Sequence, residues 1–390
     1  MSCPHCQEAA KFVDYRSCPV TTLLGKVFYQ RAYYHCSHCH QGWFPTDAEF
    51  DVSQKQTRGA RDAITLVATL EPFAESAHKV LARLTGLTVS ASTVQRTAEA
   101  VGNHLAGQRA AGKLPGPRRA WDWHRDKRGR RVGYVSLDAT AVLQQGLHGE
   151  KAESRMPWVG SVFNPPPLDR DAVPEPQRPR RISDTRYVSG LMSLEEIGRQ
   201  LRAECEAVGL SQVDVAIGLT DGGNGLEDCL IQQVFAGLVK EFVLILDFFH
   251  VSEHLGDFAK LWCAEDAARR TQKRAWCHTL KHQGGEVLLR ELSALDVSLR
   301  TPDVQEAHRL LTNYLRNNLH RLDYPTYLAN GWQIGSGEIE SACKGVIGLR
   351  LKGTGMRWRE FGTTALCHLR ALYKGESSLW EYYWTHTLTS

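Results

Sequence analysis

The stretch RVGYVSLDAT, residues 131–140, decides how the middle of this 390-residue chain folds. Its apolar run of β-branched and aromatic residues is typical of a buried strand, and the run ends at Asp138. Two later stretches repeat the arrangement: VDVAIGLTDGG ends in Asp221 and a glycine turn, and EFVLILDFFH ends in Asp247 and His250. Runs as apolar as these indicate strands buried on both faces. The sequence therefore predicts an α/β domain whose strands deliver acidic residues at their carboxyl ends.

The segments between these strands complete the expected domain. MPWVGSVFN and RYVSG are predicted strands, separated by an irregular segment at residues 165–181 that is rich in proline and arginine. Residues 191–210 are predicted to form a helix, because their apolar side chains recur on one helical face: Leu194, Ile197, Leu201 and Cys205. From Val251 to Asn330 we find only helical patterning, which predicts a helical region of roughly eighty residues.

A pair of glutamates follows that helical region. GWQIGSGEIESACKG, residues 331–345, sets Glu338 and Glu340 directly after a Gly-Ser-Gly turn and before a basic helix. Two residues apart on a helix, their side chains diverge by about 200°, so only one can face a given site. We favour Glu340, because Cys343, Ile347 and Leu351 follow it at helical spacing.

Carboxylates that converge from several elements suit a two-metal site for phosphoryl transfer, which needs two divalent ions about 3.5–4 Å apart. Mg2+, or Mn2+, prefers such oxygen ligands. Asp138 is the first expected ligand and Glu340 the last. The second position stays open between Asp221 and Asp247, since both end apolar strands, and the imidazole of His250 is expected to support the site.

Four cysteines near the N-terminus predict a second, structural metal site. Cys3-x-x-Cys6 and Cys36-x-x-Cys39 flank a segment with strand-like alternation, as in a zinc ribbon. Four thiolates complete the tetrahedral shell of one Zn2+ and leave no position for catalytic water. The sequence leaves open that Cys18 or one of the flanking histidines replaces a ligand; these are His5, His35, His38 and His40.

The residues after Pro45 have helical periodicity in two short runs. One run contains Ala77 and Leu81 and stops at Gly86; the next contains Val94 and Leu105, with Ser92 and Gln95 as its expected capping box. Two such helices predict a helix-turn-helix, whose second helix would present three side chains to DNA: Thr93, Gln95 and Arg96. The alternative is a helical hairpin that only packs. The basic run at residues 115–131 is expected to be a solvated linker that contacts phosphates.

The composition restricts the class of protein. Hydrophobic residues make up 42% of the chain and charged residues 23%, as in an ordinary globular protein, and the formal net charge is +4. We find neither a signal peptide nor an apolar run of membrane-spanning length. Eleven cysteines without a secretion signal favour reduced thiols and metal binding. We therefore expect a cytoplasmic protein.

Several motifs together resemble the DDE-type transposases of bacterial insertion sequences, in particular the ISKra group, which is related to Mutator-like transposases. The resemblance covers most of the chain and is most specific at residues 334–358, IGSGEIESACKGVIGLRLKGTGMRW. It also rests on the stretches LDAT, TDGG, LILDFFHVSEHL and RLDYP. One departure is Ala139, which stands where the family usually has glycine.

This resemblance implies an RNase H-like core interrupted by an all-α insertion and preceded by a zinc ribbon and a helix-turn-helix domain. It assigns the catalytic, Mg2+-binding residues to Asp138, to Asp221 at the end of the fourth strand, and to Glu340. Asp247 and His250 match the Asp-x-x-His signature. The implied segments are 1–46 (ribbon), 47–114 (helix-turn-helix), 115–131 (basic linker), 132–250 (core, first part), 251–333 (insertion) and 334–390 (C-terminal core helices).

The expected function is cleavage at insertion-sequence ends and transfer of the 3′ hydroxyl into target DNA, by a homodimer or larger assembly. Basic side chains beyond Glu340 are expected to contact the DNA backbone, with Trp358 stacking on an unpaired base; these residues are Lys344, Arg350, Lys352, Arg357 and Arg359. Two alternatives remain open: a metal-dependent nuclease or resolvase of the same fold that does not join, and a catalytically inactive zinc-containing DNA-binding protein.

Overall fold

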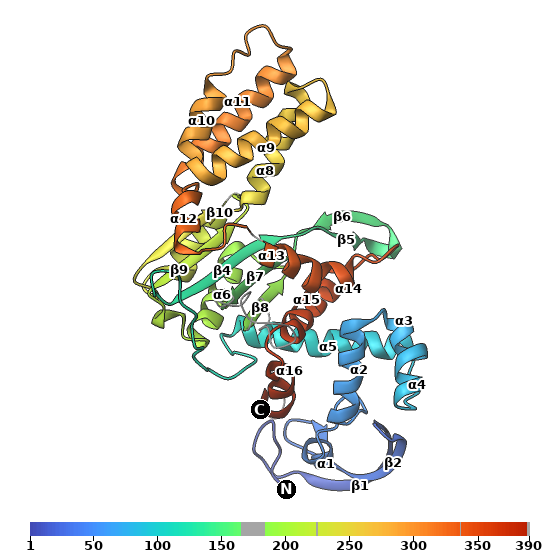
Figure 1. Cartoon of the computed structure of the whole chain (residues 1–390). Coiled ribbons are helices and arrows are strands. Elements are labelled where there is room, and N and C mark those ends of the chain that lie inside the picture. The colour runs from blue at the N-terminus through green and yellow to red at the C-terminus, as the bar shows by residue number, and fades with distance from the viewer. Residues whose placement is uncertain (165–183, 224, 336, 388–390) are drawn as a thin grey trace.

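The computed structural model describes residues 1–164, 184–223, 225–335 and 337–387. It is a mixed α/β protein in which a five-stranded sheet lies between a helical arm and an N-terminal region of helices and a small sheet (Figure 1). The proline- and arginine-rich segment at 165–181 lies outside the described residues. No described helix has both the length and the apolar character needed to cross a membrane.

The central sheet contains all five strands that the sequence predicts for this region. They are β4 (Val132–Ala139), β7 (Trp158–Phe163), β8 (Thr185–Gly190), β9 (Val215–Thr220) and β10 (Phe242–Leu246), in the order β10-β9-β4-β7-β8. β4, β9 and β10 run parallel, while β7 and β8 are antiparallel to their neighbours. Every residue of β9 is buried, as its apolar sequence predicts.

Helices cover both faces of this sheet. On one face lies the predicted helix α6 (Leu194–Ala207), together with α7 (Leu226–Asp228) and the π-helical turn Cys229–Phe235 that continues it. These elements share a hydrophobic cluster with Val135 and Leu137 of β4. Tyr134 of the same strand belongs to a different cluster, which extends into the helical arm. Alternate side chains of β4 therefore anchor two separate parts of the core.

The helical arm corresponds to the predicted all-helical region. It contains α8 (Phe248–Trp262), α9 (Asp266–Gln283), α10 (Gly285–Ser293), α11 (Pro302–Asn317) and α12 (Tyr324–Asn330). The chain leaves the sheet and returns to it at one place, where the backbone N–H of Phe248 donates to the carbonyl of Ile334 at 2.9 Å. The arm therefore extends from the carboxyl end of β10 without interrupting the sheet (Figure 1).

The N-terminal region begins with the strands β1 (Lys11–Thr22), β2 (Gly25–His35) and β3 (Gly42–Trp43), followed by α1 (Pro45–Glu49) and α2 (Arg58–Leu70). The two predicted helices follow: residues 73–84, comprising α3 (Phe73–Glu75), a π-helical turn and α4 (Ala82–Leu84), and then α5 (Ala91–Ala110). The predicted cap was wrong. Ser90, and not Ser92, accepts from the N–H of Thr93, because the helix begins two residues earlier than the capping box requires.

The C-terminal helices pack against this N-terminal region. α13 (Gly337–Ala342) continues through a π-helical turn into α14 (Leu349–Leu351), and α15 (Glu360–Lys374) and α16 (Ser378–Tyr382) follow. One hydrophobic cluster contains Leu105 of α5 together with Leu369 of α15 and Trp380 of α16. Segments assigned by sequence to separate domains, 47–114 and 334–390, thus share a core.

The basic run at 115–131 is anchored to the sheet domain. Trp121 and Trp123 are buried, and the backbone N–H of Trp121 donates to the carbonyl of Val208 at 2.9 Å. Five of its basic side chains are exposed, which fits the solvated character expected of them, whereas Asp126 is buried; the exposed members are Arg118, Arg119, Arg125, Lys127 and Arg128. Two apolar anchors within a charged run therefore fix a segment that its composition predicts to be a free linker.

The contact between α5 and α15 depends on a glycine. A Cβ built on Gly102 would lie 2.5 Å from the carbonyl oxygen of Ala365 and 2.7 Å from its Cα, and backbone atoms cannot move aside as a side chain can. Gly107, on the same helix, would place a Cβ in open space. The two glycines are a matched pair for testing the shared core.

We predict that Gly102→Ala destabilises the protein by about 1–3 kcal/mol, because the two helices must separate. Gly107→Ala should leave stability unchanged or raise it by up to about 1 kcal/mol, through the higher helix propensity of alanine. Thermal unfolding followed by circular dichroism measures both effects. Equal midpoints for the two variants would contradict this account of the contact.

Candidate functional site

Three aspartates follow the carboxyl ends of the three parallel strands of the central sheet, and therefore lie in one row. β4 pairs with β9 in a register that matches Ser136 to Leu219, and β9 pairs with β10 in a register that matches Thr220 to Leu246. Asp138 and Asp221 each stand two residues beyond the first pair, and Asp247 stands one residue beyond the second. Because neighbouring strands are about 4.8 Å apart, this register predicts that the three residues form a row.

Each carboxylate is oriented by a nearby backbone N–H. Asp138 accepts from Ala139 at 2.6 Å, Asp221 accepts from Gly223 at 2.8 Å, and Asp247 accepts from Phe249 at 2.9 Å. The last bond makes Asp247 the N-cap of α8, and only 6% of this residue is exposed. Helix capping therefore explains why an aspartate stands at position 247. Asp221 caps no described helix and is half-buried in the loop that follows β9.

Asp138 is in an environment that disfavours its charge. Burial raises the pKa of its carboxyl, and the negative charge of Asp221 raises it further, while the hydrogen bond from Ala139 acts in the opposite direction. The carboxylates of Asp138 and Asp221 are therefore close enough to repel each other, and solvent screens this repulsion only partly. A bound cation would remove this repulsion, so the pair fits a divalent metal by its charge and its oxygen donors.

The helix that carries the two glutamates touches this pair directly. The thiol of Cys343 donates to Oδ2 of Asp138 at 3.4 Å, and burial, followed by the negative charge of Asp138, raises the pKa of that thiol. Glu340 precedes Cys343 by three residues and lies within about 60° of it around the helix, whereas Glu338 is turned away by about 140°. Glu338 instead lies near Tyr187 of β8, whose pKa rises to about 12 through burial and through the charge of Glu338.

A close contact holds the start of this helix against the arm. A Cβ on Gly335 would lie 2.5 Å from the ring of Phe249, which follows Asp247 in the first turn of α8. Glycine is therefore required at 335 unless the ring moves. Ser336 lies outside the described residues. This contact and the bond between Phe248 and Ile334 keep α13 next to the aspartates.

An aromatic and imidazole cluster forms the side of the site nearest the arm. Nε2 of His250 lies 3.2 Å from Nε2 of His254, one turn further along α8. The ring of His254 packs on Tyr314 of α11 with 4.5 Å between centroids, and the hydroxyl of Tyr314 donates to the backbone carbonyl of Asp221 at 3.4 Å. Sequence reasoning missed His254 and Tyr314. The i, i+4 spacing of the histidines could have identified the first, but nothing local marks the second.

The N-terminal cysteines form the one tight metal-type cluster in the described part of the chain. The Sγ atoms of Cys3, Cys6, Cys36 and Cys39 all lie within 4.8 Å of one another, and no other described group of three or more potential ligands does so. The carboxylates at the sheet edge are thus more widely spread. Two of the sulfur separations, 3.5 and 3.6 Å, are close to the roughly 3.8 Å edge of a zinc-thiolate tetrahedron.

The four cysteines can therefore hold a structural zinc ion. The backbone N–H of Cys39 contributes most to lowering the pKa of Cys36 to about 7, whereas burial and hydrogen bonds among the thiols raise the pKa of Cys6 and Cys39. Cys18, which the sequence left as an alternative ligand, is buried elsewhere on β1, and its thiol donates to the carbonyl of Pro19. The four histidine alternatives are likewise absent from the cluster among the described residues.

The residues predicted to read DNA lie at the start of α5. Gln95 and Arg96 are exposed, and Thr93 is half-buried, with its hydroxyl 2.9 Å from that of Ser90. Gln95 lines a pocket of about 820 Å³ that also contains Arg357 and Arg359. Lys344 and Lys352 are exposed, and the amine of Lys352 donates to the hydroxyl of Thr140.

Two of the predicted DNA contacts are in the interior instead. Arg350 is 2% exposed, its Nε donates to the carbonyl of Ala68 at 2.9 Å, and its guanidinium lies over the rings of Phe73 and Trp358. Trp358 is 7% exposed, and its indole N–H donates to the carbonyl of Leu351 at 2.9 Å. Their stacked, hydrogen-bonded geometry gives both residues a structural role. The sequence predicts DNA contacts for both residues because positive charges surround them there.

A hairpin that sequence reasoning missed supports this segment. β5 (Val142–Gln145) and β6 (Lys151–Arg155) project from the end of β4, and the backbone N–H of Gln145 donates to the carbonyl of Trp358 at 2.7 Å. The backbone N–H of Trp358 donates in return to Leu143 at 3.0 Å. The loop that carries Arg357 and Arg359 is therefore fixed against β5, the strand that follows β4 and its Asp138 in the chain.

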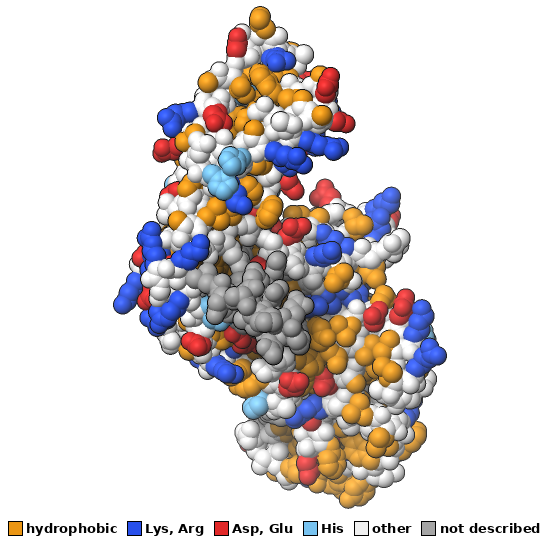
Figure 2. All heavy atoms as spheres, viewed as in Figure 1, with side chains coloured by type: hydrophobic (Ala, Val, Ile, Leu, Met, Phe, Trp, Pro, Cys, Tyr) orange, Lys and Arg blue, Asp and Glu red, His pale blue; other side chains and the backbone are white. Residues whose placement is uncertain are grey.

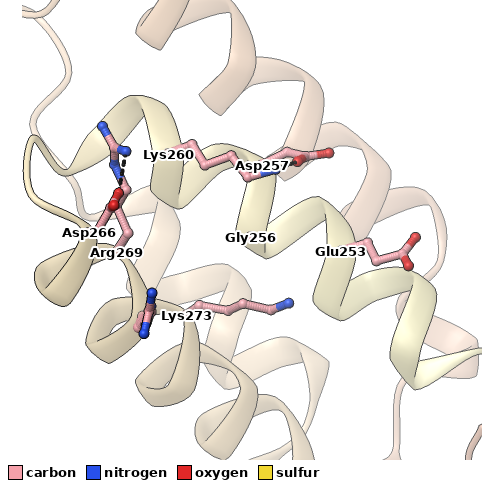
Figure 3. A pocket seen from close by; sticks show the side chains of 8 residues that line it. Glu253, Gly256, Asp257, Lys260, Asp266, Arg269 and Lys273 are labelled. Carbon is pink, nitrogen blue, oxygen red and sulfur yellow. Dashed lines mark hydrogen bonds and ion pairs between the residues drawn. The ribbon is translucent and has the colours of Figure 1, made fainter.

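A second charged groove lies on the helical arm, between α8 and α9 (Figure 3). It has a volume of about 600 Å³ and is lined by residues of both charges: Glu253, Gly256, Asp257, Lys260, Asp266, Arg269, Arg270 and Lys273. Lys260 pairs with Asp257 and Arg269 pairs with Asp266, each at 2.7 Å. Because of these internal pairs, the groove is less basic than its count of cations suggests.

Comparison with known proteins does not assign the chain to a family. Neither a scan against protein-family models nor a search of curated proteins found a match. The functional argument therefore depends on the geometry of the site and on the motifs in the sequence.

The charge conflict at Asp138 leads to a stability prediction. With its pKa raised in the folded state, Asp138 binds more protons when folded than when unfolded, so it lowers stability as pH rises above about 3.8 through the folded pKa. We predict that Asp138→Asn raises the melting temperature at pH 7, although its single amide oxygen can keep only one of the two hydrogen bonds that the carboxylate accepts from Ala139 and Cys343. The gain should shrink as pH falls toward 4.

Asp214 is the matched control with the opposite sign. Hydrogen bonds from Arg131 lower its pKa, so Asp214→Asn should lower the melting temperature at pH 7. Differential scanning fluorimetry from pH 4 to pH 8 measures both variants. If the Asp138→Asn variant is less stable than the parent at pH 7, the prediction is wrong, because the negative charge of Asp138 is then stabilised by other groups in the folded protein.

Proposed function

We propose that this protein is a DDE-type DNA transposase with an RNase H-like core, which cleaves DNA at the ends of an insertion sequence and joins the 3′ end to target DNA. One arrangement carries the proposal: Asp138 and Asp221 stand just beyond the ends of adjacent parallel strands, where their negative charges repel each other. Cys343, on the helix that carries the glutamates, donates a hydrogen bond to Asp138.

The chain order of the sheet supports this assignment. Among the strands of the central sheet, β4 is the first and β9 is the fourth, so Asp138 and Asp221 occupy the positions that the resemblance gives to the first two catalytic aspartates. The all-helical segment precedes α13, as the resemblance also implies. Glu340 is favoured over Glu338 because it lies on the side of the helix that meets Asp138.

Asp138, Asp221 and Glu340 would hold two Mg2+ or Mn2+ ions. Bound there, the ions supply activation of the attacking water or 3′ hydroxyl and stabilisation of the leaving oxygen. The chain itself orients each aspartate through a backbone N–H and keeps Asp138 poorly solvated, which strengthens its interaction with a cation.

Exposed cations near this site supply a surface for DNA. Lys344 and Arg359 follow the glutamate on the same segment. Gln95 at the start of α5 lines the 820 Å³ pocket together with Arg359, and the exposed Arg96 follows Gln95. Phosphate neutralisation by such side chains accounts for most non-specific affinity for DNA. We infer that the duplex runs from α5 across the loop at 352–359 to the carboxylates.

We predict that Glu340→Gln lowers the rate of Mg2+-dependent nicking at the element boundary by about 100-fold or more, since a lost metal ligand removes several kcal/mol of transition-state stabilisation. Glu338→Gln, on the same turn of helix, should remain within a few-fold of the parent. The measurement uses an end-labelled duplex spanning the boundary, with Mg2+ or EDTA, on a denaturing gel.

The products of this assay separate the proposal from its alternatives. Covalent joining of the cut strand to a second duplex supports a transposase, whereas cleavage without joining supports a nuclease or resolvase. Binding without cleavage, even with Mn2+ present, contradicts catalysis and leaves a DNA-binding protein. Equal loss in both glutamate variants would contradict the choice of Glu340.

A further inference from the structure

The β1–β2 ribbon has two unlike faces. A bulge shifts the register between Phe12 and Asp14, so that Phe12 and Tyr15, three residues apart, lie on the same face with their ring centroids 5.1 Å apart. We call this the outer face. Its members are Phe12, Tyr15, Ser17, Pro19 and Thr21 of β1, and Lys26, Phe28, Gln30, Ala32 and Tyr34 of β2.

The opposite, inner face already has partners within the chain. Cys18 and Val20 are buried, and the side chains of Tyr29 and Arg31 donate to the carboxylate of Asp47 on α1. The inner face thus fixes the ribbon on the helical region, and the zinc-type cysteine cluster closes one end of the ribbon.

The outer face is apolar and accessible. Phe12 is 48% exposed, Tyr15 69% and Phe28 71%, and Leu24 at the tip is 98% exposed. Figure 2 shows hydrophobic side chains gathered over the lower end of the molecule, where Figure 1 places the ribbon. Among the described residues of this face, Lys26 carries the only formal charge. Contiguous exposed apolar surface of this kind marks an interaction site.

We propose that the outer face packs against the same face of a second copy of this chain, forming a two-fold symmetric dimer. A two-fold interface brings one patch against itself, and a largely uncharged face, with Lys26 next to the turn of the hairpin, can pack on itself with little charge repulsion. The same composition argues against DNA as the occupant, because neutralising phosphates needs several cations. The proposal does not depend on the carboxylate site.

The size of the face is sufficient for this contact. The three exposed aromatic side chains of the outer face and Leu24 at the tip of the ribbon together present on the order of 600 Å², given about 150–250 Å² for a fully exposed aromatic residue. Two copies would then bury about 1,200 Å², which exceeds the roughly 1,000 Å² expected of a specific interface. Packing occurs through the faces, because the bulge and the exposed pair of Arg16 with Asp14 disfavour pairing through the edge of β1.

Sedimentation equilibrium of the full chain from about 1 to 50 μM tests the proposal. We expect the parent to be a dimer, and the double variant Tyr15→Ser, Phe28→Ser to have a dissociation constant at least about tenfold higher. Leu299→Ser is the matched control, because Leu299 is 94% exposed on the helical arm and should not affect association. Retention of one zinc per chain, measured by mass spectrometry, shows that each variant keeps the ribbon folded.

A monomeric parent at 50 μM, or a double variant that keeps its zinc and dimerises like the parent, overturns the proposal. A second measurement does not depend on how the double variant folds. With a benzoylphenylalanine photocrosslinker in place of Phe28, irradiation should join two chains through peptides of residues 11–35. Crosslinks only to DNA, or only to another region of the chain, overturn the proposal.

Discussion

The structure depends most on the parallel pairing of β4 with β9. β4 is the middle strand of the sheet and its residues 132–137 are buried, so its register fixes what stands at the end of both strands. That register sets Asp138 beside Asp221, so their negative charges repel each other at the carboxyl ends of the two strands. The repulsion is tolerated because packing of the strands stabilises the domain elsewhere. Carboxylates held where their charged form is disfavoured are often functional residues.

The parts that surround this edge are held together by contacts between distant segments. α5 and α15 approach closely at Gly102, and a buried network links Arg109 of α5 to Glu204 of α6 at 3.1 Å, while Arg186 of β8 reaches both Glu204 and Glu376. Removing one partner of such a network leaves a buried charge without compensation, which is strongly destabilising. The N-terminal helices and the sheet domain therefore form one continuous structure, and the start of α5 has a defined position relative to Asp138.

Much of the fold follows from local sequence patterns. Five strands of the sheet, α6 and the helical arm were predicted because apolar runs and helical periodicity are local signals, and the four-cysteine cluster follows from its spacing. The errors have a common cause. Arg350 and Trp358 lie in a basic segment, yet they are buried, because their environment comes from Phe73 and Ala68, almost 300 residues away in the chain. Tyr314 was missed for the same reason, and the anchoring of the basic linker depends on two tryptophans within its charged run.

We propose that Asp138, Asp221 and Glu340 together hold divalent cations. Anomalous diffraction from crystals of the protein with Mn2+ and a DNA end tests it directly. We expect strong manganese peaks within about 2.5 Å of carboxylate oxygens of Asp138 and Asp221, and we expect Glu340 to coordinate one of the manganese ions. Absence of manganese between the two aspartates, or coordination by Glu338 in place of Glu340, would contradict it.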